Sequence, residues 1–477
     1  GTIPRLPDRY PLTTVYYDRL LQGDLGYTLV QEFTSYPNLG FISLMDTTFS
    51  RPELPKPEYN GPDISPLVTL NLGFADESFT VYDHPKVLVF KNTNRRTKDQ
   101  ILSMLTTRAP PEPIGLLLTS KEIQAQRAGG TFSQLFDVSS ISNRFPAVTW
   151  LLLVELVSLV VLPIAFVLFR GLPDRGYLLS KIMGLLLLAY IPWVLASQGL
   201  MTFGIGSIYL GLAIITLPAV TIAILKRNQI LIFLSRRWRV LAFEEALFVL
   251  AFIAFLFLRW ANPDLWHPFR GGEKPMDFAY LNAVAKSSTL PPYDPWYAGG
   301  YLNYYYFGQF IVASLIRFTG VVPSVAYNLA VPLLFALTVG GVYSIVSGLA
   351  ELTLRARRVP AWSRRSPVYA GLAAVVLVVI AGNIDGLLQV LQGASRTFFQ
   401  DGSFGQFDFW RSSRMMPPDP PGHEITEFPF FTFLFADLHA HLIAIPIAIT
   451  AFAATISVYL RIGRKRPIVE SLAGLFV

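Results

Sequence analysis

Long apolar stretches, separated by shorter polar ones, fill the last two thirds of the chain. Each stretch has roughly the 20 residues that a helix needs to cross the hydrocarbon core of a bilayer. The pattern predicts seven membrane-spanning helices: Pro146–Phe169, Tyr177–Ala196, Phe203–Leu225, Leu241–Leu258, Ser324–Leu349, Val368–Ile384 and His441–Leu460. Composition agrees, because 52% of the 477 residues are hydrophobic and only 15% are charged, whereas about a quarter of a soluble chain is charged. We therefore interpret the chain as an integral membrane protein.

The first 145 residues have a different pattern. Apolar and polar residues alternate over Leu67–Asn92, which predicts two or three strands, and helices are expected at Leu12–Leu21 and Lys98–Leu105. We predict a small α/β or α+β domain over residues 1–145 and a membrane domain over residues 146–477. The start at Gly1 without an initiator Met, and the apolar run that stops at Val477, suggest a part of a longer polypeptide.

Basic residues predict the orientation of the membrane domain. They cluster after the first, third and last predicted spans, and the positive-inside rule places these connections in the cytoplasm. The Arg355–Arg365 cluster joins them only if Tyr301–Phe318 lies along the outer interface as an aromatic-rich helix instead of crossing. The N-terminal domain and two long loops, Arg259–Phe318 and Asn383–Ala440, are then outside. The cytoplasmic loops account for the net charge of +7, which favours anionic lipid and argues against nucleic acid.

The first outer loop carries the clearest candidate for chemistry. Asp277 lies among apolar residues at helical spacing, close to Glu273 and Lys274. Burying a carboxylate is unfavourable, and a role as a catalytic base would explain why one lies here. Several aromatic residues nearby offer faces for sugar stacking or lipid contact, although packing at the interface is the better explanation for any single ring: Tyr280, Trp296, Tyr297, Tyr304 and Tyr305.

The second outer loop holds a further set of polar candidates. Arg411 and Arg414 could clamp a phosphate, or they could face lipid headgroups. Asp437, His439 and His441 could bind a divalent metal such as Mg²⁺ or Mn²⁺, or orient a base; alternatively, Asp437 caps the following helix. Glu427 is a weaker candidate for the same cavity. The absence of cysteine excludes disulfides and thiolate metal sites.

Two segments resemble a known family. The stretch Glu273–Gln309, with its Tyr304-Tyr305-Tyr306 triplet, and the run Phe409–Pro446 are similar to signatures of the YYY-domain family of uncharacterised polytopic membrane proteins. That family in turn distantly resembles the GT-C glycosyltransferases, which implies a multi-span helical bundle with juxtamembrane helices on the outer face.

The GT-C resemblance also implies an activity. Such enzymes take a sugar from a polyprenyl-phosphate donor on the outer face, with an acid in the first long outer loop as base, and Asp277 matches that position. Phe278 departs from the pattern, since many of these enzymes have a second acid there. Phe74–Asn92 resembles the exported tail of such transferases, which implies that residues 1–145 close a preceding transferase half.

The expected function is therefore an inverting glycosyltransferase that moves a sugar from a polyprenyl phosphate to an acceptor hydroxyl. Two alternatives stay open. One is a transporter of lipid-linked sugars, for which we expect charges along a path through the spans; the acidic residues within them are Glu155 and the pair Glu244-Glu245. The other is a catalytically silent structural subunit of a larger membrane assembly.

Overall fold

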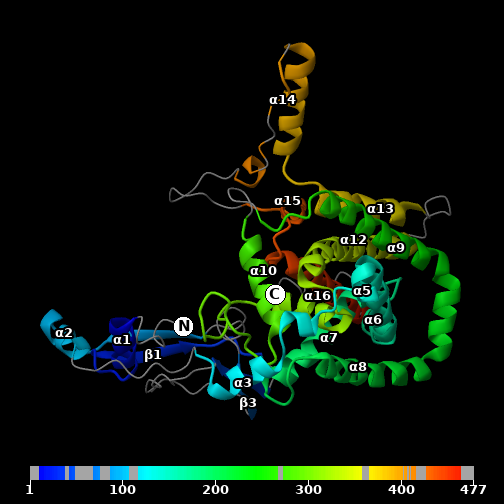
Figure 1. The fold of residues 1–477 in the computed structure, drawn as a ribbon. Coiled ribbons are helices and arrows are strands. Elements are labelled where there is room, and N and C mark those ends of the chain that lie inside the picture. Colours follow the sequence, from blue (N-terminus) through cyan, green and yellow to red (C-terminus); the bar gives the residue numbers. More distant parts are fainter. Residues whose placement is uncertain are drawn as a thin grey trace. The chain divides into compact units, whose positions relative to one another are not determined.

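The computed structural model describes residues 10–37, 42–48, 68–75, 86–106, 117–266, 272–356, 365–400, 402–405, 408, 410–414 and 426–463. The chain divides into two compact units (Figure 1). The first comprises Gly1–Gly129 and Thr289–Tyr306, and the second comprises Gly130–Ser288 and Phe307–Val477.

The first unit mixes helices and strands. Its helices are α1 (Pro11–Leu21), α2 (Lys98–Thr106) and α3 (Ser120–Ala128). Strands β1 (Tyr27–Phe33) and β4 (Val87–Asn92) pair antiparallel, whereas β2 (Ile42–Thr48) and β3 (Val68–Ala75) pair parallel. The predicted helices are confirmed to within a residue. The alternating stretch contains β3 and β4, and residues 76–85 between them lie outside the described part.

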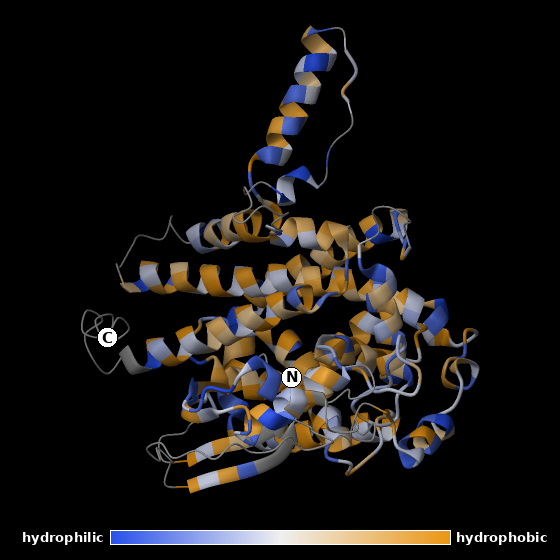
Figure 2. Ribbon diagram, turned by 90° about the vertical axis from the view of Figure 1, so that its left-hand side faces the viewer, coloured by the Kyte–Doolittle hydropathy of each residue, from blue (hydrophilic) through white to orange (hydrophobic). Residues whose placement is uncertain are grey.

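The second unit contains six helices that are long and apolar enough to cross a membrane. Two short helices, α4 (Phe132–Leu135) and α5 (Ile141–Arg144), precede them. The six are α6 (Pro146–Leu168), α7 (Leu179–Ser197), α8 (Ile205–Leu225), α9 (Arg227–Ala261), α12 (Pro323–Ala356) and α16 (Ala440–Gly463). Figure 2 shows that apolar residues dominate these long helices. Because α12 is almost wholly buried and packs on α9, α13 (Ser366–Val375) and α16, it forms the centre of this unit.

The sixth predicted span, Val368–Ile384, is broken in the structure. Helix α13 (Ser366–Val375) continues into a π-helical turn, η4 (Val376–Ile380), and the chain then bends by 81° into α14 (Asp385–Phe399). Gly382 lies at the break, where an added Cβ would stand 2.1 Å from the Phe428 ring. The described residues therefore contain six candidate spans, or seven if this bent pair is one span.

Two contacts place the basic ends of several spans together. Arg237, near the start of α9, pairs with Glu351 near the end of α12 at 2.6 Å. The backbone N–H of Gly171, just after α6, donates to Ser457 Oγ near the end of α16 at 3.1 Å. The described basic residues at these ends therefore share one end of the unit, as predicted. Which side of the membrane this end faces stays a prediction.

Two of the acidic residues inside the spans, Glu155 and Glu245, contact basic and aromatic side chains. Lys181 Nζ in α7 lies 2.5 Å from Glu155 Oε1 in α6 and 2.9 Å from Glu245 Oε2 in α9. The Tyr177 hydroxyl donates to the same Glu245 oxygen at 2.9 Å. These contacts tie three spans together at the basic end.

The expected interfacial helix is shorter and more buried than predicted. Helix α11 (Phe307–Thr319) begins after the tyrosines, which belong to the first unit, and every residue from Gln309 to Ile316 is buried. Gly308 allows the close approach, because an added Cβ would stand 2.7 Å from Ile443 of α16. The helix is thus a packed element of the bundle.

Candidate functional site

Helix α10 (Lys274–Lys286) positions Asp277 in its first turn. Gly272 precedes the helix with φ +63°, and Pro275 lies in the first turn, where its missing N–H costs no hydrogen bond. The Asp277 side chain is fully buried, and neither carboxylate oxygen has a hydrogen-bond partner among the described residues. Burial, with the negative charges of Asp437 and Glu273, raises the pKa of Asp277 to about 8, against the opposing charge of Lys274.

Asp437 lies in the short segment 436–439, between α15 (Pro429–Phe435) and α16. The buried Tyr327 hydroxyl of α12 fixes this segment: it accepts from the Leu438 N–H at 2.8 Å and donates to the Ala436 carbonyl at 3.3 Å. Gln309 of α11 donates to the Leu438 carbonyl at 3.1 Å. Two helices of the bundle thus determine where Asp437 lies.

The Asp437 carboxylate reaches α10 directly. Its Oδ2 accepts a hydrogen bond from the Glu273 N–H at 3.0 Å, and its Oδ1 lies 3.7 Å from Lys274 Nζ. Only glycine fits at position 272, because an added Cβ would stand 2.4 Å from Asp437 Oδ2. Burial raises the pKa of Asp437, while the Glu273 N–H and the Lys274 charge oppose this change.

Asp277, Asp437 and His439 form one cluster, which we call the acidic trio. Each residue offers one ligand atom, and these atoms all lie within 4.8 Å of one another. His439 Nε2 is 3.8 Å from Asp277 Oδ1 and 2.5 Å from Glu273 Oε2. Two buried carboxylates this close repel each other unless a proton or a cation lies between them. The trio is therefore a site for positive charge.

The trio has donors that suit a divalent cation. Two carboxylate oxygens and an imidazole nitrogen match Mg²⁺ or Mn²⁺, which prefer oxygen ligands. Asp277 offers two oxygens without hydrogen bonds, and Asp437 offers Oδ1. The residues present therefore fit a metal, with three protein ligands and coordination positions left for water or substrate.

His441, predicted as a third metal ligand, lies outside the trio. Its Nε2 is 3.2 Å from Glu427 Oε2, and its side chain is half exposed. The Glu427 carboxylate also accepts from the Thr432 hydroxyl at 3.3 Å. The hydrogen bond with His441 is the main cause that lowers the pKa of Glu427. The pair lies beside the trio, since the His439 and His441 rings are 5.3 Å apart.

The two arginines of the predicted phosphate clamp have different roles. Arg411, in the 3₁₀ turn η5 (Arg411–Ser413), pairs with Asp385 at the start of α14, with Nη2 2.7 Å from Oδ1. Arg414 lies over the Trp410 ring at 5.1 Å. Arg411 therefore already has a carboxylate partner, and a phosphate clamp by both side chains stays a prediction.

The η5 turn still borders the trio. The Trp410 and Phe435 rings lie 4.8 Å apart, and Lys274 Nζ lies 4.5 Å from the centre of the same Phe435 ring. The edge-to-face contact of Trp410 with Phe435 and the contact of Phe435 with Lys274 link the second long loop to the first turn of α10.

The predicted aromatic residues are divided between the two units. Tyr280 is buried in α10. Trp296, Tyr297, Tyr304 and Tyr305 belong to the first unit, where the last two stack with ring centres 4.0 Å apart and share a hydroxyl hydrogen bond of 2.7 Å. Sugar stacking by these four residues stays a prediction.

The residues that hold the segment of Asp437 in place were not found by sequence analysis. Tyr327 and Gln309 lie in apolar helices, and nothing in the spacing indicates that they bind a segment more than 100 residues away. The sequence does indicate Gly272, because paired glycines before a helix often mark a place where the backbone closely approaches another group. Phe278 packs edge-on against Tyr327 at 6.1 Å, so the position after Asp277 supports the same tyrosine.

Comparison with known proteins assigns the chain to a protein family. Residues 187–476 match a family described as "Uncharacterized membrane protein (DUF2298)", and the match covers α10 and the segment 436–439. No curated protein and no solved structure matches the chain. The match spans more than half of the chain and confirms the resemblance to the YYY-domain family. The chain therefore belongs to the DUF2298 family of membrane proteins.

Proposed function

We propose that the chain is part of a membrane glycosyltransferase, which moves a sugar from a polyprenyl phosphate to an acceptor hydroxyl on the outer membrane face. The observation that carries the proposal is the acidic trio, in which a fully buried Asp277 presents two oxygens without hydrogen bonds. The position of Asp277 in the first long loop agrees with the distant GT-C resemblance. Perturbed carboxylates that converge in this way are typical of catalytic sites.

The proposed reaction is a single displacement. The acceptor oxygen attacks the anomeric carbon while its proton moves to the Asp277 carboxylate. The bond between the anomeric carbon and the phosphate oxygen breaks, and polyprenyl phosphate leaves with the electron pair. Attack opposite to the leaving group inverts the configuration. A base with a pKa of about 8 is well matched to a reaction near neutral pH.

The neighbours of Asp277 have distinct roles in this proposal. Lys274 supplies positive charge near the leaving phosphate, and His439, hydrogen bonded to Glu273, orients the trio. A Mg²⁺ or Mn²⁺ held by the trio supplies further positive charge to that phosphate when bound. Asp437 provides the second carboxylate that many related transferases have directly after the first.

The test is turnover by the purified chain in lipid nanodiscs, with polyprenyl-phosphate-linked hexoses as donors and water or a sugar hydroxyl as acceptor. We expect release of polyprenyl phosphate by the wild type and none by Asp277→Asn. Asp385→Asn is a matched control, because Asp385 is also a buried acid but pairs with Arg411. Unchanged turnover by Asp277→Asn would remove it as the base. No turnover of any such donor would favour the silent structural subunit.

A further inference from the structure

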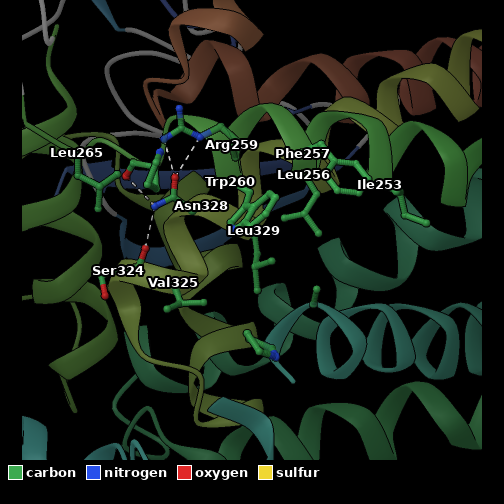
Figure 3. A pocket seen from close by; sticks show the side chains of 13 residues that line it. Ile253, Leu256, Phe257, Arg259, Trp260, Leu265, Ser324, Val325, Asn328 and Leu329 are labelled. Carbon is green, nitrogen blue, oxygen red and sulfur yellow. Dashed lines mark hydrogen bonds between the residues drawn. The ribbon is translucent and has the colours of Figure 1, made fainter. Parts of the chain in front are cut away.

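An apolar groove lies between the start of α6, the end of α9 and the start of α12 (Figure 3). Its volume is about 680 Å³, within the range of small-molecule sites. Most of the side chains that line it are hydrocarbon, among them Ile253, Leu256, Phe257, Val325 and Leu329. A groove of this kind at the end of membrane-spanning helices suits a lipid chain.

Arg259 is the charged residue that lines the groove. Its side chain is only 4% exposed, and its Nε and Nη2 donate to Asn328 Oδ1 at 3.0 and 2.5 Å. Nη2 also lies 3.4 Å from the Asp264 carbonyl oxygen. In the part of the chain that the structure describes, no carboxylate forms an ion pair with this guanidinium. Buried arginines are normally paired with an acid, so a bound anion would complement this charge.

The partners of Arg259 hold it in a fixed position. Asn328 donates to the Pro263 and Ser324 carbonyls at 3.2 and 3.1 Å, so both ends of its amide are engaged (Figure 3). The guanidinium is therefore set by α9 and α12 together. Such a preorganised fork suits the oxygens of a phosphate better than a lysine would.

The groove lies close to the acidic trio. Asn328 follows Tyr327 in α12, and the Tyr327 hydroxyl binds the segment that carries Asp437. Burial lowers the pKa of Lys274, and the nearby positive charge of Arg259 adds to this effect, against the attraction of Asp437. A phosphate on Arg259 would thus be near the trio while its chain extends along the groove.

The geometry points to this groove as the binding site for the first isoprene units of a polyprenyl phosphate, with the phosphate on Arg259. The identity of this lipid rests on the proposed function. Phe257 and Trp260, on the groove wall, are 60% and 77% exposed, which leaves the groove accessible from the bilayer. The volume fits part of one chain, and the rest of the chain stays in the membrane.

The test uses a photoactivatable polyprenyl phosphate with the full chain in nanodiscs of uncharged lipid. We expect cross-links at groove residues, identified by mass spectrometry. Unlabelled polyprenyl phosphate should compete, whereas the uncharged polyprenol, phosphatidylglycerol and inorganic phosphate should not. Equal competition by polyprenol would show that the phosphate is not recognised, and equal competition by phosphatidylglycerol would show that any anionic lipid suffices; either result would overturn the inference.

Variants separate the role of Arg259 from a purely structural one. Arg259→Gln should weaken binding by roughly tenfold or more, as expected for a lost hydrogen bond to a charged group. Arg317→Gln is the matched control: Arg317 is half-buried in α11, donates to the Phe203 carbonyl at 3.1 Å and does not line the groove. An equal loss in both variants would contradict the inference. If Arg259→Gln fails to fold, Val325→Trp, which fills the groove and keeps the arginine, should abolish the cross-link.

The proposed lipid site and the proposed reaction can be refuted independently of each other. Asp277→Asn should keep the cross-link and its competition pattern, because Asp277 does not line the groove. Labelled groove residues without any sugar transfer would leave the lipid site standing and remove the transferase. Sugar transfer without labelled groove residues would support the transferase and refute the lipid site.

Discussion

The replacement Asp277→Asn should stabilise the protein while it abolishes the proposed reaction. Burial and two neighbouring carboxylates raise the pKa of Asp277 from 3.8 to about 8. Between these pH values the folded chain keeps a proton that the unfolded chain has released, so the folded state loses stability as the pH rises. Each pH unit in this interval costs about 1.4 kcal/mol.

The size of the effect follows from this difference. The cost of ionising Asp277 is absent below about pH 4, reaches about 4 kcal/mol at pH 7 and levels off at about 6 kcal/mol above pH 8. An asparagine amide does not ionise and escapes this cost. Its polar atoms lack partners in the same way as those of the protonated acid, so that penalty is common to both side chains. The variant should therefore be more stable than the wild type at pH 8 and equal to it near pH 4.

Thermal unfolding in detergent with a chelator, followed by tryptophan fluorescence between pH 4 and 9, measures this difference. We expect Asp277→Asn to melt roughly 5 to 10 °C above the wild type at pH 8. The control Asp385→Asn should melt lower at neutral pH, because that carboxylate pairs with Arg411 and accepts from Gln389. A variant that melts at or below the wild type at pH 8, or by a margin independent of pH, would refute the reasoning.

Three further predictions concern the surroundings of Asp277. Mn²⁺ should raise the melting temperature of the wild type, because at 100 times its Kd it stabilises the folded chain by about 2.7 kcal/mol. A His439→Ala variant should respond much less. An equal response would contradict metal binding by the trio. Tyr327→Phe should lower stability by about 1–3 kcal/mol in denaturant unfolding, because the Leu438 N–H and the Ala436 carbonyl lose their buried partner. Arg411→Ala should lower the melting temperature but keep turnover per folded molecule, and a selective loss of turnover would restore its role on the phosphate.

Hydrophobic length predicted most of the membrane unit, because a helix in lipid must satisfy its own backbone and leaves a long apolar signature. It did not reveal the bend at the end of Val368–Ile384, where Gly382 packs closely against Phe428 and polar residues follow. It also misplaced α11, whose aromatic composition resembles an interfacial helix. Composition does not reveal that other helices cover both faces of α11, since lipid and protein surroundings favour the same residues.

The site was predictable residue by residue but not as an arrangement. A carboxylate between apolar positions indicated Asp277, and the concentration of acids and histidines indicated Asp437 and His439. The pairing of Arg411 with Asp385 had no sequence signal, because it depends on where α14 starts relative to η5. The link between Tyr327 and the Asp437 segment likewise exists only in the packed bundle.

The long separation between the two parts of the trio affects when the site comes into existence. The Glu273 N–H donates to the Asp437 carboxylate although the two residues are 164 positions apart in the sequence. During synthesis, α10 emerges well before α12 offers Tyr327, and long before α15 and α16 deliver the second carboxylate. A nascent or incompletely inserted chain therefore holds Asp277 without Asp437 and His439. The acidic trio forms only after the later helices have been inserted and have packed against α10.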